Sequence, residues 1–311
     1  MNSIRKDLNS YLGMTKRNIL IYLKDKMTLL FSMLSPLIVL CLYLLFLKNT
    51  YVNSISSIFT ESGAIVDLSD INALVNSWLL SGVLGTSVIT VSLSSLVPMV
   101  EDKAAKIDFD YTASPVKKSI VFLSYLSGAF VNTFFIASVI LSGGFIVMSI
   151  QGAFNYTFLE VLESFGVVAL GSLSATLFFI IFVSFFKRTP VLSAFSVIIS
   201  TASGFVVGAY IPLGQFSITT QKILNAVPGS VITGILRNIL MTPPIDKINT
   251  ILGGVDNGSF VSSVRSIFSL DLNMFINNFN IPAMYLYSIV FIGILLVLNL
   301  VLFRISSKRK Y

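Results

Sequence analysis

The residues best able to do chemistry lie in one polar segment, Glu101 to Ser119, between two of the longest uncharged runs of the chain. It reads EDKAAKIDFDYTASPVKKS, nineteen residues of which eight are charged, four acidic and four basic. A charged segment between apolar runs has to leave a bilayer, because one charge at a helix centre costs about 2.5 to 3.5 kcal/mol on insertion scales. The net charge of the segment is zero, and we expect it to be the contact with a separate soluble partner.

Apolar residues inside this segment would anchor such a partner. The candidates are Phe109, Tyr111 and Val116, on a short helix that Pro115 would end. The charges that would set the register at the start of the segment are Glu101, Asp102 and Lys103. The alternative interpretation is that residues 101–119 form only a solvated loop.

Sets of residues for other chemistry are missing. The chain has no histidine, which removes the commonest general base and metal ligand. Its one cysteine, Cys41, lies in an apolar run, where we expect it to be buried. Polar residues in the apolar runs are serines and threonines that we expect to hydrogen-bond between helices, as at Ser92, Ser94, Ser95, Thr133, Ser138, Ser172, Ser174 and Thr176. The lack of carboxylates at mid-membrane argues against an ion-coupled transporter, and the missing catalytic sets argue against a membrane enzyme.

The composition predicts an all-α integral membrane protein. Of 311 residues 55% are hydrophobic and 11% charged, with a mean hydropathy of +0.88. Soluble domains have about a quarter of their residues charged. A net charge of +7 that is unevenly distributed along the chain reports membrane topology, and we do not take it as a sign of nucleic-acid binding.

The elements that position the polar segment follow from the uncharged runs. Residues 1–26 carry six basic residues and apolar residues spaced by three and four, which predicts an amphipathic helix on the membrane surface. Each predicted segment has at least the roughly 20 residues that a spanning helix needs. Six spans are predicted within 27–47, 71–100, 120–150, 162–186, 189–210 and 283–303. Residues 48–70 are predicted to be a loop.

The region between the fifth and sixth spans differs from the rest. Residues 212–241 are too polar for an ordinary span and too apolar for a free loop. Pro212 and the pair Pro228-Gly229 interrupt helices there, so we expect two short helices that dip into the outer leaflet. Residues 242–282, rich in Asn, Ser and Gly, are predicted to form a small extracellular lobe. Gly204 and Gly208 form a GxxxG pattern, for packing within one subunit or contact between two.

The distribution of basic residues predicts the topology. Sixteen of the 21 Lys and Arg residues fall in the terminal segments, in residues 101–119 and in the turn at Lys187-Arg188. By the positive-inside rule these segments are cytoplasmic. We therefore expect a multi-pass protein of the cell (plasma) membrane with both termini in the cytoplasm.

The order of these elements resembles the permease subunits of ABC-2 type transporters. Those subunits have an elbow helix, here 1–26, and a six-span domain, here 27–311, with an acidic-basic loop between the second and third spans. The sequence YTASPVKK, Tyr111 to Lys118, matches the turn that closes this loop, whereas Lys106-Ile107-Asp108 replaces the usual Gly-Thr. After the fifth span the order of prolines and one arginine is also similar, at Pro212, Pro228, Gly229 and Arg237.

This resemblance implies an ATP-driven exporter of an amphipathic substrate, such as a drug, an antimicrobial peptide or a lipid-linked molecule. ATP and Mg would be bound by a separate ABC ATPase, expected in two copies, because this chain has no Walker sequence and no cofactor of its own. A second permease, identical or related, and membrane lipid would be its other partners. The implied coupling residues are Glu101, Asp102, Lys103, Phe109, Tyr111, Pro115 and Val116, and the implied gate residues are Pro212, Pro228, Gly229 and Arg237. The alternative is a membrane sensor or scaffold protein that transports nothing.

Overall fold

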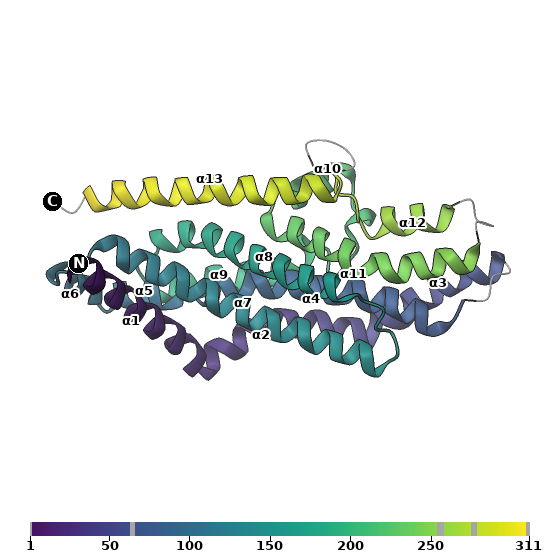
Figure 1. Ribbon diagram of the computed structural model, residues 1–311, viewed down its shortest axis with the longest axis horizontal. Coiled ribbons are helices and arrows are strands. Elements are labelled where there is room, and N and C mark those ends of the chain that lie inside the picture. The colour runs from purple at the N-terminus through teal and green to yellow at the C-terminus, as the bar shows by residue number, and fades with distance from the viewer. Residues whose placement is uncertain (1, 63–65, 254–257, 275–278, 309–311) are drawn as a thin grey trace.

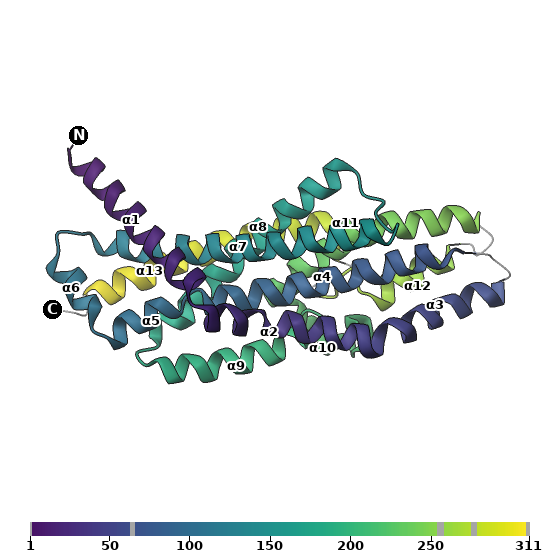
Figure 2. The ribbon, with the colours of Figure 1, turned by 90° about the horizontal axis from the view of Figure 1, so that it is seen from below.

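Long helices lying along one axis make up the protein. The computed structural model describes residues 2–62, 66–253, 258–274 and 279–308, which are helical almost throughout (Figure 1). Both termini lie at the same end of the molecule, together with the short helix α6 (Ile107–Ala113) (Figures 1 and 2). The predicted all-α fold class is confirmed. We call this end of the molecule the α6 end.

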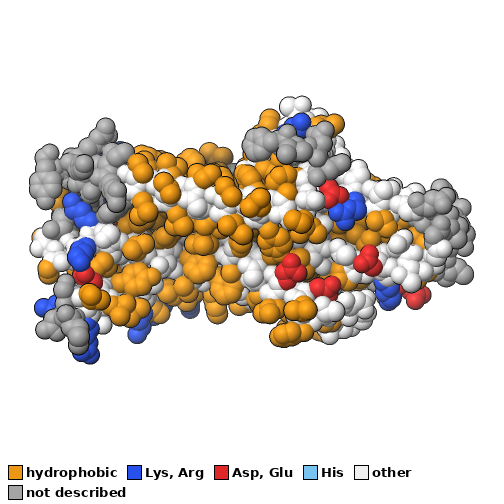
Figure 3. All heavy atoms as spheres, turned by 45° about the horizontal axis from the view of Figure 1, so that its top comes forward, with side chains coloured by type: hydrophobic (Ala, Val, Ile, Leu, Met, Phe, Trp, Pro, Cys, Tyr) orange, Lys and Arg blue, Asp and Glu red, His pale blue; other side chains and the backbone are white. Residues whose placement is uncertain are grey.

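Within the described residues, five helices are long and apolar enough to cross a membrane, and there are up to seven spans if each of two bent pairs counts as one. The five are α4 with α5 (Leu68–Ser94, Val97–Ala104), α7 (Lys118–Ile150), α8 (Phe158–Phe185), α9 (Thr189–Val206) and α13 (Ile281–Lys308). The bent pairs are α1 (Asn2–Lys24) with α2 (Lys26–Leu42), at 72°, and α10 (Ile218–Asn225) with α11 (Pro228–Leu252), at 101°. Hydrophobic side chains cover the middle of the face shown in Figure 3, and charged ones lie towards its ends. The structure thus indicates a membrane-embedded, multi-pass protein.

Helix α4 lies at the centre of the bundle, where it packs against α2, α7, α8, α9 and α11. It packs tightly against α11 at Gly85, where an added Cβ would overlap the side chain of Thr233. Nearly all of α4 is buried, including polar residues such as Ser81 and Thr86. The bundle is therefore organised around the helix that precedes residues 101–119.

The prediction of a loop at residues 48–70 was wrong for most of that range. Helix α2 continues through a π-helical turn, η1 (Tyr43–Leu47), into helix α3 (Lys48–Ser62), and α4 begins at Leu68. Val52 and Ile55 of α3 are buried in a second core, and the ring of Tyr51 lies 5.0 Å from that of Trp78. Packing of these side chains outweighs the low helix propensity of the Ser and Asn residues in the segment.

The prediction of two short helices within residues 212–241 was half wrong. Helix α10 has eight residues, but α11 has 25 and continues to Leu252. The first eleven residues of the predicted lobe are thus the end of a helix, and α12 (Ser259–Ile267) follows. The second core joins these helices to α3 and α4, so the lobe is not built from residues 242–282 alone. Residues 254–257 and 275–278 of the lobe, and 309–311 of the basic tail, lie outside the described residues.

A tyrosine compensates for one of the two prolines inside α11, Pro243 and Pro244. Pro244 has no N–H, so the carbonyl of Leu240, four residues earlier, loses its helical partner. The buried Tyr156 hydroxyl donates a hydrogen bond to this carbonyl at 3.0 Å, and Ser77 Oγ lies 2.8 Å from the same hydroxyl. Tyr156 thus compensates for the break in the helix.

We expect the Tyr156→Phe change to lower the free energy of unfolding by about 1 to 2 kcal/mol, because a buried carbonyl loses its donor. The measurement is thermal unfolding of the purified chain in detergent. Tyr285→Phe is the control, since that hydroxyl donates to Glu163 at an exposed site. Its expected effect is about 0.5 kcal/mol or less. Equal losses in the two variants would contradict the role given to Tyr156.

The structure also bears on the predictions for the serines and threonines of the apolar runs, for Cys41 and for the GxxxG pattern. Five of the eight predicted helix-to-helix hydrogen bonds are made instead to the carbonyl three or four residues earlier in the same helix, by Ser92, Thr133, Ser172, Ser174 and Thr176. Cys41 is exposed, not buried. The GxxxG pattern serves packing within the chain, because Gly204 lies against the ring of Tyr210 and Gly208 lies beyond the end of α9.

Candidate functional site

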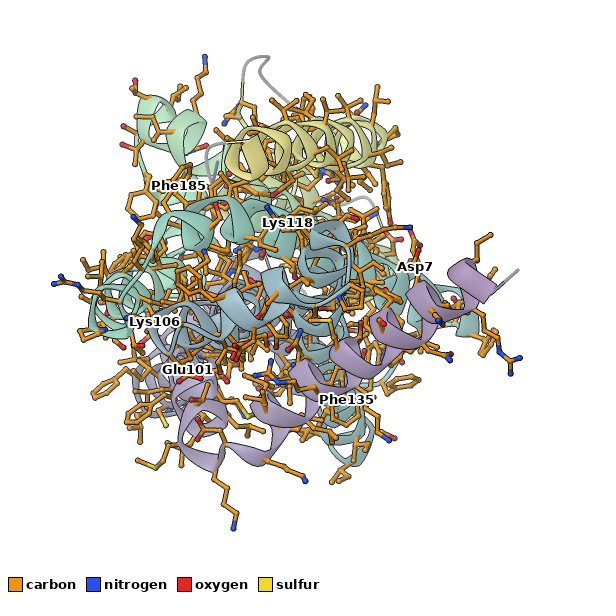
Figure 4. The ribbon with its side chains drawn as sticks, turned by 90° about the vertical axis from the view of Figure 1, so that its left-hand side faces the viewer. Asp7, Glu101, Lys106, Lys118, Phe135 and Phe185 are labelled. Carbon is orange, nitrogen blue, oxygen red and sulfur yellow. The ribbon has the colours of Figure 1, made fainter. Side chains whose placement is uncertain are left out.

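The α6 end carries residues 101–119, and Figure 4 views it directly. Helix α5 extends into the segment as far as Ala104, and the chain then turns at Lys106, whose φ of 62° is left-handed. Helix α6 follows, and residues 114–117 lead into α7. The short helix predicted within residues 101–119 is therefore present, and it connects two long helices.

Asp102 is the centre of a buried polar cluster. It is 4% exposed and accepts two hydrogen bonds from the guanidinium of Arg17, at 2.7 and 2.8 Å. Tyr125 donates a third hydrogen bond to Asp102. The bonds from Asp102 raise the pKa of Arg17 above its usual value, against the opposing effect of partial burial. One carboxylate thus joins three helices, α1, α5 and α7, in a fork geometry that favours arginine.

Helix α1 contacts the protein through polar residues near its start and through Tyr22 and Leu23 near its end. Tyr11 lies 2.6 Å from Ser127 through their hydroxyl oxygens, and Lys117 forms an ion pair with Asp7. Helices α1 and α7 pack closely at Gly128, because a Cβ added to this glycine would lie 3.0 Å from the Cβ of Asn18. The opposite side of α1 exposes an apolar stripe of Ile4, Leu8, Leu12 and Leu20. The position of α1 on a membrane surface, with this stripe in lipid, stays a prediction.

Lys103 ties α5 to a fourth helix. Its ammonium donates to the carbonyl of Ser184, near the end of α8, at 2.8 Å. Of the three charges that open the segment, Asp102 and Lys103 thus bind groups inside the chain, and only Glu101 is exposed. Sequence reasoning missed the pairing of Arg17 with Asp102, because no periodicity or spacing links positions 85 residues apart.

The candidate anchors divide into outward and inward side chains. Phe109 is 62% exposed on α6, and Pro115 is exposed after it. Tyr111 is half-buried, and burial, followed by the nearby charge of Asp102, raises the pKa of its phenol. Val116 is also half-buried. Of the three predicted apolar anchors, only Phe109 is exposed, so it is the main apolar group on the surface of α6.

The four gate residues lie elsewhere, around the start of α11. Arg237 is fully buried and donates to the carbonyls of Val207 and Gly208 at 2.5 and 2.9 Å, and to Phe268 at 3.4 Å. Pro228 and Gly229 form the first turn of α11, and Pro212 precedes the 3₁₀ turn η2 (Leu213–Gln215). Helix α11 does not reach the α6 end (Figure 1). The coupling and gate candidates are thus two separate groups.

Comparison with protein-family models, with curated proteins and with solved structures gave no match. Among the described residues, no three His, Cys, Asp or Glu side chains are grouped as a metal site would require.

Proposed function

We propose that this chain is the membrane-spanning permease subunit of an ATP-driven ABC exporter, powered by a separate ATPase. The observation that carries the proposal is the cluster around Asp102, which connects the segment 101–119 to α1, α5 and α7. A load applied to α6 would pass through this cluster to three helices at once.

In this proposal six helices span the membrane and the α10–α11 pair re-enters it from outside. The first span is α2, and α1 lies on the inner surface with its apolar stripe in lipid. The bend of 101° between α10 and α11 supports the re-entrant assignment, as does the burial of α11 against α4 and α8. By the positive-inside rule the α6 end, which carries most of the basic residues, would face the cytoplasm, where ATP is available.

The chain itself has no ATPase site in this proposal, so the energy must arrive from outside. Moving a two-state gate from 1:99 to 99:1 takes about 5.5 kcal/mol of differential free energy. An ATPase seated on α6 would supply it, with Phe109 as apolar anchor and Glu101 as an outer charge. A second permease would complete the export path, and the scarcity of charged residues in the six proposed spans favours an amphipathic substrate such as a drug, an antimicrobial peptide or a lipid-linked molecule.

The double change Phe109→Ala/Tyr111→Ala should abolish co-purification of ATP-hydrolysing activity with the tagged chain. Removal of the exposed phenyl group takes away the main apolar contact of α6, and removal of Tyr111 loosens its underside. The measurement is ATP turnover in the affinity-purified membrane extract. Phe158→Ala is the control, because Phe158 is a phenylalanine at the start of α8, away from the α6 end, and is 80% exposed against 62% for Phe109.

Unchanged ATP turnover in the double variant would refute docking at α6. Absence of ATPase activity even with the unaltered chain would refute the exporter and leave the sensor or scaffold interpretation. The two outcomes can be told apart, because the first is seen only if the unaltered chain binds an ATPase, whereas in the second the unaltered chain binds none.

A further inference from the structure

Buried polar side chains of α10 and α11 hold a short stretch of the outer lobe. Asn225 Nδ2 donates to the carbonyl of Asn273 at 2.9 Å, and Asn238 Nδ2 donates to that of Leu270 at 2.6 Å. Arg237 Nη1 reaches the carbonyl of Phe268. Three side chains from the α10–α11 pair thus bind the backbone of one segment, residues 266–273, which we call the latch segment.

Arg237 connects this segment to a second helix end. Two of its acceptors, the carbonyls of Val207 and Gly208, lie just after α9, and the third, Phe268, is the residue at which α12 ends. Carbonyls at helix C-termini lack helical donors and carry partial negative charge. No carboxylate among the described residues forms an ion pair with Arg237, so these carbonyls alone stabilise its charge. One guanidinium therefore holds the ends of α9 and α12 together.

The latch segment also contacts the turn that follows α9. A Cβ added to Gly214 would overlap the carbonyl oxygens of Ser266 and Ile267, so the two backbones touch. Leu272 of the latch segment is fully buried and lies on Gly234 of α11. The segment is thus clamped between the α9–α10 connection and α11.

The chemistry of these contacts suits reversible release. They are hydrogen bonds from side chains to carbonyls, and water can take over both partners once the segment lifts away. A guanidinium fork can bond two separated groups of carbonyls at once, whereas the single ammonium of a lysine has no such planar geometry. Replacing Arg237 by lysine would therefore keep the positive charge but remove the fork that bonds both groups of carbonyls.

We propose that residues 266–273 form a latch that keeps the outer ends of α9, α10 and α11 together, and that Arg237 is the positioning residue that closes it. The latch rests on the proposed function in one respect: its release would open the outer exit of the export path. Closure itself is a property of this chain alone.

The test uses a cysteine reporter in the full chain, held in lipid nanodiscs. Cys41→Ser removes the single native cysteine. Leu272→Cys places a thiol on the buried side of the latch segment itself. A water-soluble maleimide should label this thiol slowly. Adding Arg237→Lys should raise the labelling rate about tenfold or more, because the labelled form is the locally opened one. Arg265→Lys is the matched control, since Arg265 pairs with Asp271 in the same segment but is partly exposed.

A second variant keeps the test decisive if Arg237→Lys does not fold. Gly214→Ala pushes the latch from its other side and should also raise labelling, while monodisperse elution reports that the fold is retained. Unchanged labelling in the folded variants, or an equal rise with Arg265→Lys, overturns the latch. Because the assay contains no ATPase, the latch and the exporter proposal can fail independently.

Discussion

The Asp102→Ala change should lower the free energy of unfolding by about 3 kcal/mol, since removal of one partner of a buried ion pair leaves the other charge uncompensated. Arg17 loses both of its bonds to the carboxylate, and the hydroxyl of Tyr125 loses its acceptor. Water reaches Arg17, whose side chain is 35% exposed, and this places the loss at the lower end of the range for buried pairs. Thermal unfolding of the purified chain in detergent measures the effect.

Asp7→Ala provides the matched control for this prediction. Asp7 also pairs with a cation across α1 and α7, but the side chain of Lys117 is 62% exposed. Exposed pairs contribute about 0 to 1 kcal/mol, so this variant should be close to the unaltered chain. The double change Arg17→Ala/Asp102→Ala should cost less than the sum of the single changes, because the two groups interact directly. Additive losses would show that the contact between Arg17 and Asp102 does not stabilise the protein.

The Gly85→Ala change should also be strongly destabilising, by about 1 to 3 kcal/mol, as expected when a methyl group is forced into a packed core. The added Cβ would overlap Thr233 Oγ1, and both helices are buried at this point. Helix α4 would have to move away from α11 at this contact. The loss is measured as a lower midpoint of thermal unfolding in detergent.

Two further variants separate this crowding from a general effect of alanine. Gly143→Ala adds the same methyl group where nothing lies within 4 Å, and it should leave the midpoint unchanged or raise it slightly. Thr233→Ala removes the overlapping hydroxyl, so the double change Gly85→Ala/Thr233→Ala should recover part of the loss. A double variant less stable than Gly85→Ala alone would contradict the steric explanation.

Prediction from the sequence succeeded where one property dominated. Five of the six predicted spans lie in helices that are long and apolar enough to cross a bilayer, because length and hydropathy largely decide whether a segment can do so. It failed at residues 48–62, where Ser and Asn indicated a loop and burial of Val52 and Ile55 made a helix. It failed again after residue 241, where Tyr156 stabilises a helix that Pro244 would otherwise break.

The candidate site shows the same division. The charges of residues 101–119 and the helix around Phe109 could be predicted, since they are local features. That Asp102 and Lys103 bind within the chain could not, because their partners, Arg17 and Ser184, lie 85 and 81 residues away. The outward position of Phe109 and the inward position of Tyr111 likewise follow from how α6 is seated.

The sequence by itself determined that this is an all-helical membrane protein with a polar segment at Glu101 to Ser119, because hydropathy and charge act locally along the chain. Only the tertiary structure decided which of those charges are exposed and which bind groups within the bundle. It also decided that Arg237 joins the ends of two helices. The physical reason is that a buried charge is stable only where the fold supplies its partners, and those partners come from distant parts of the chain.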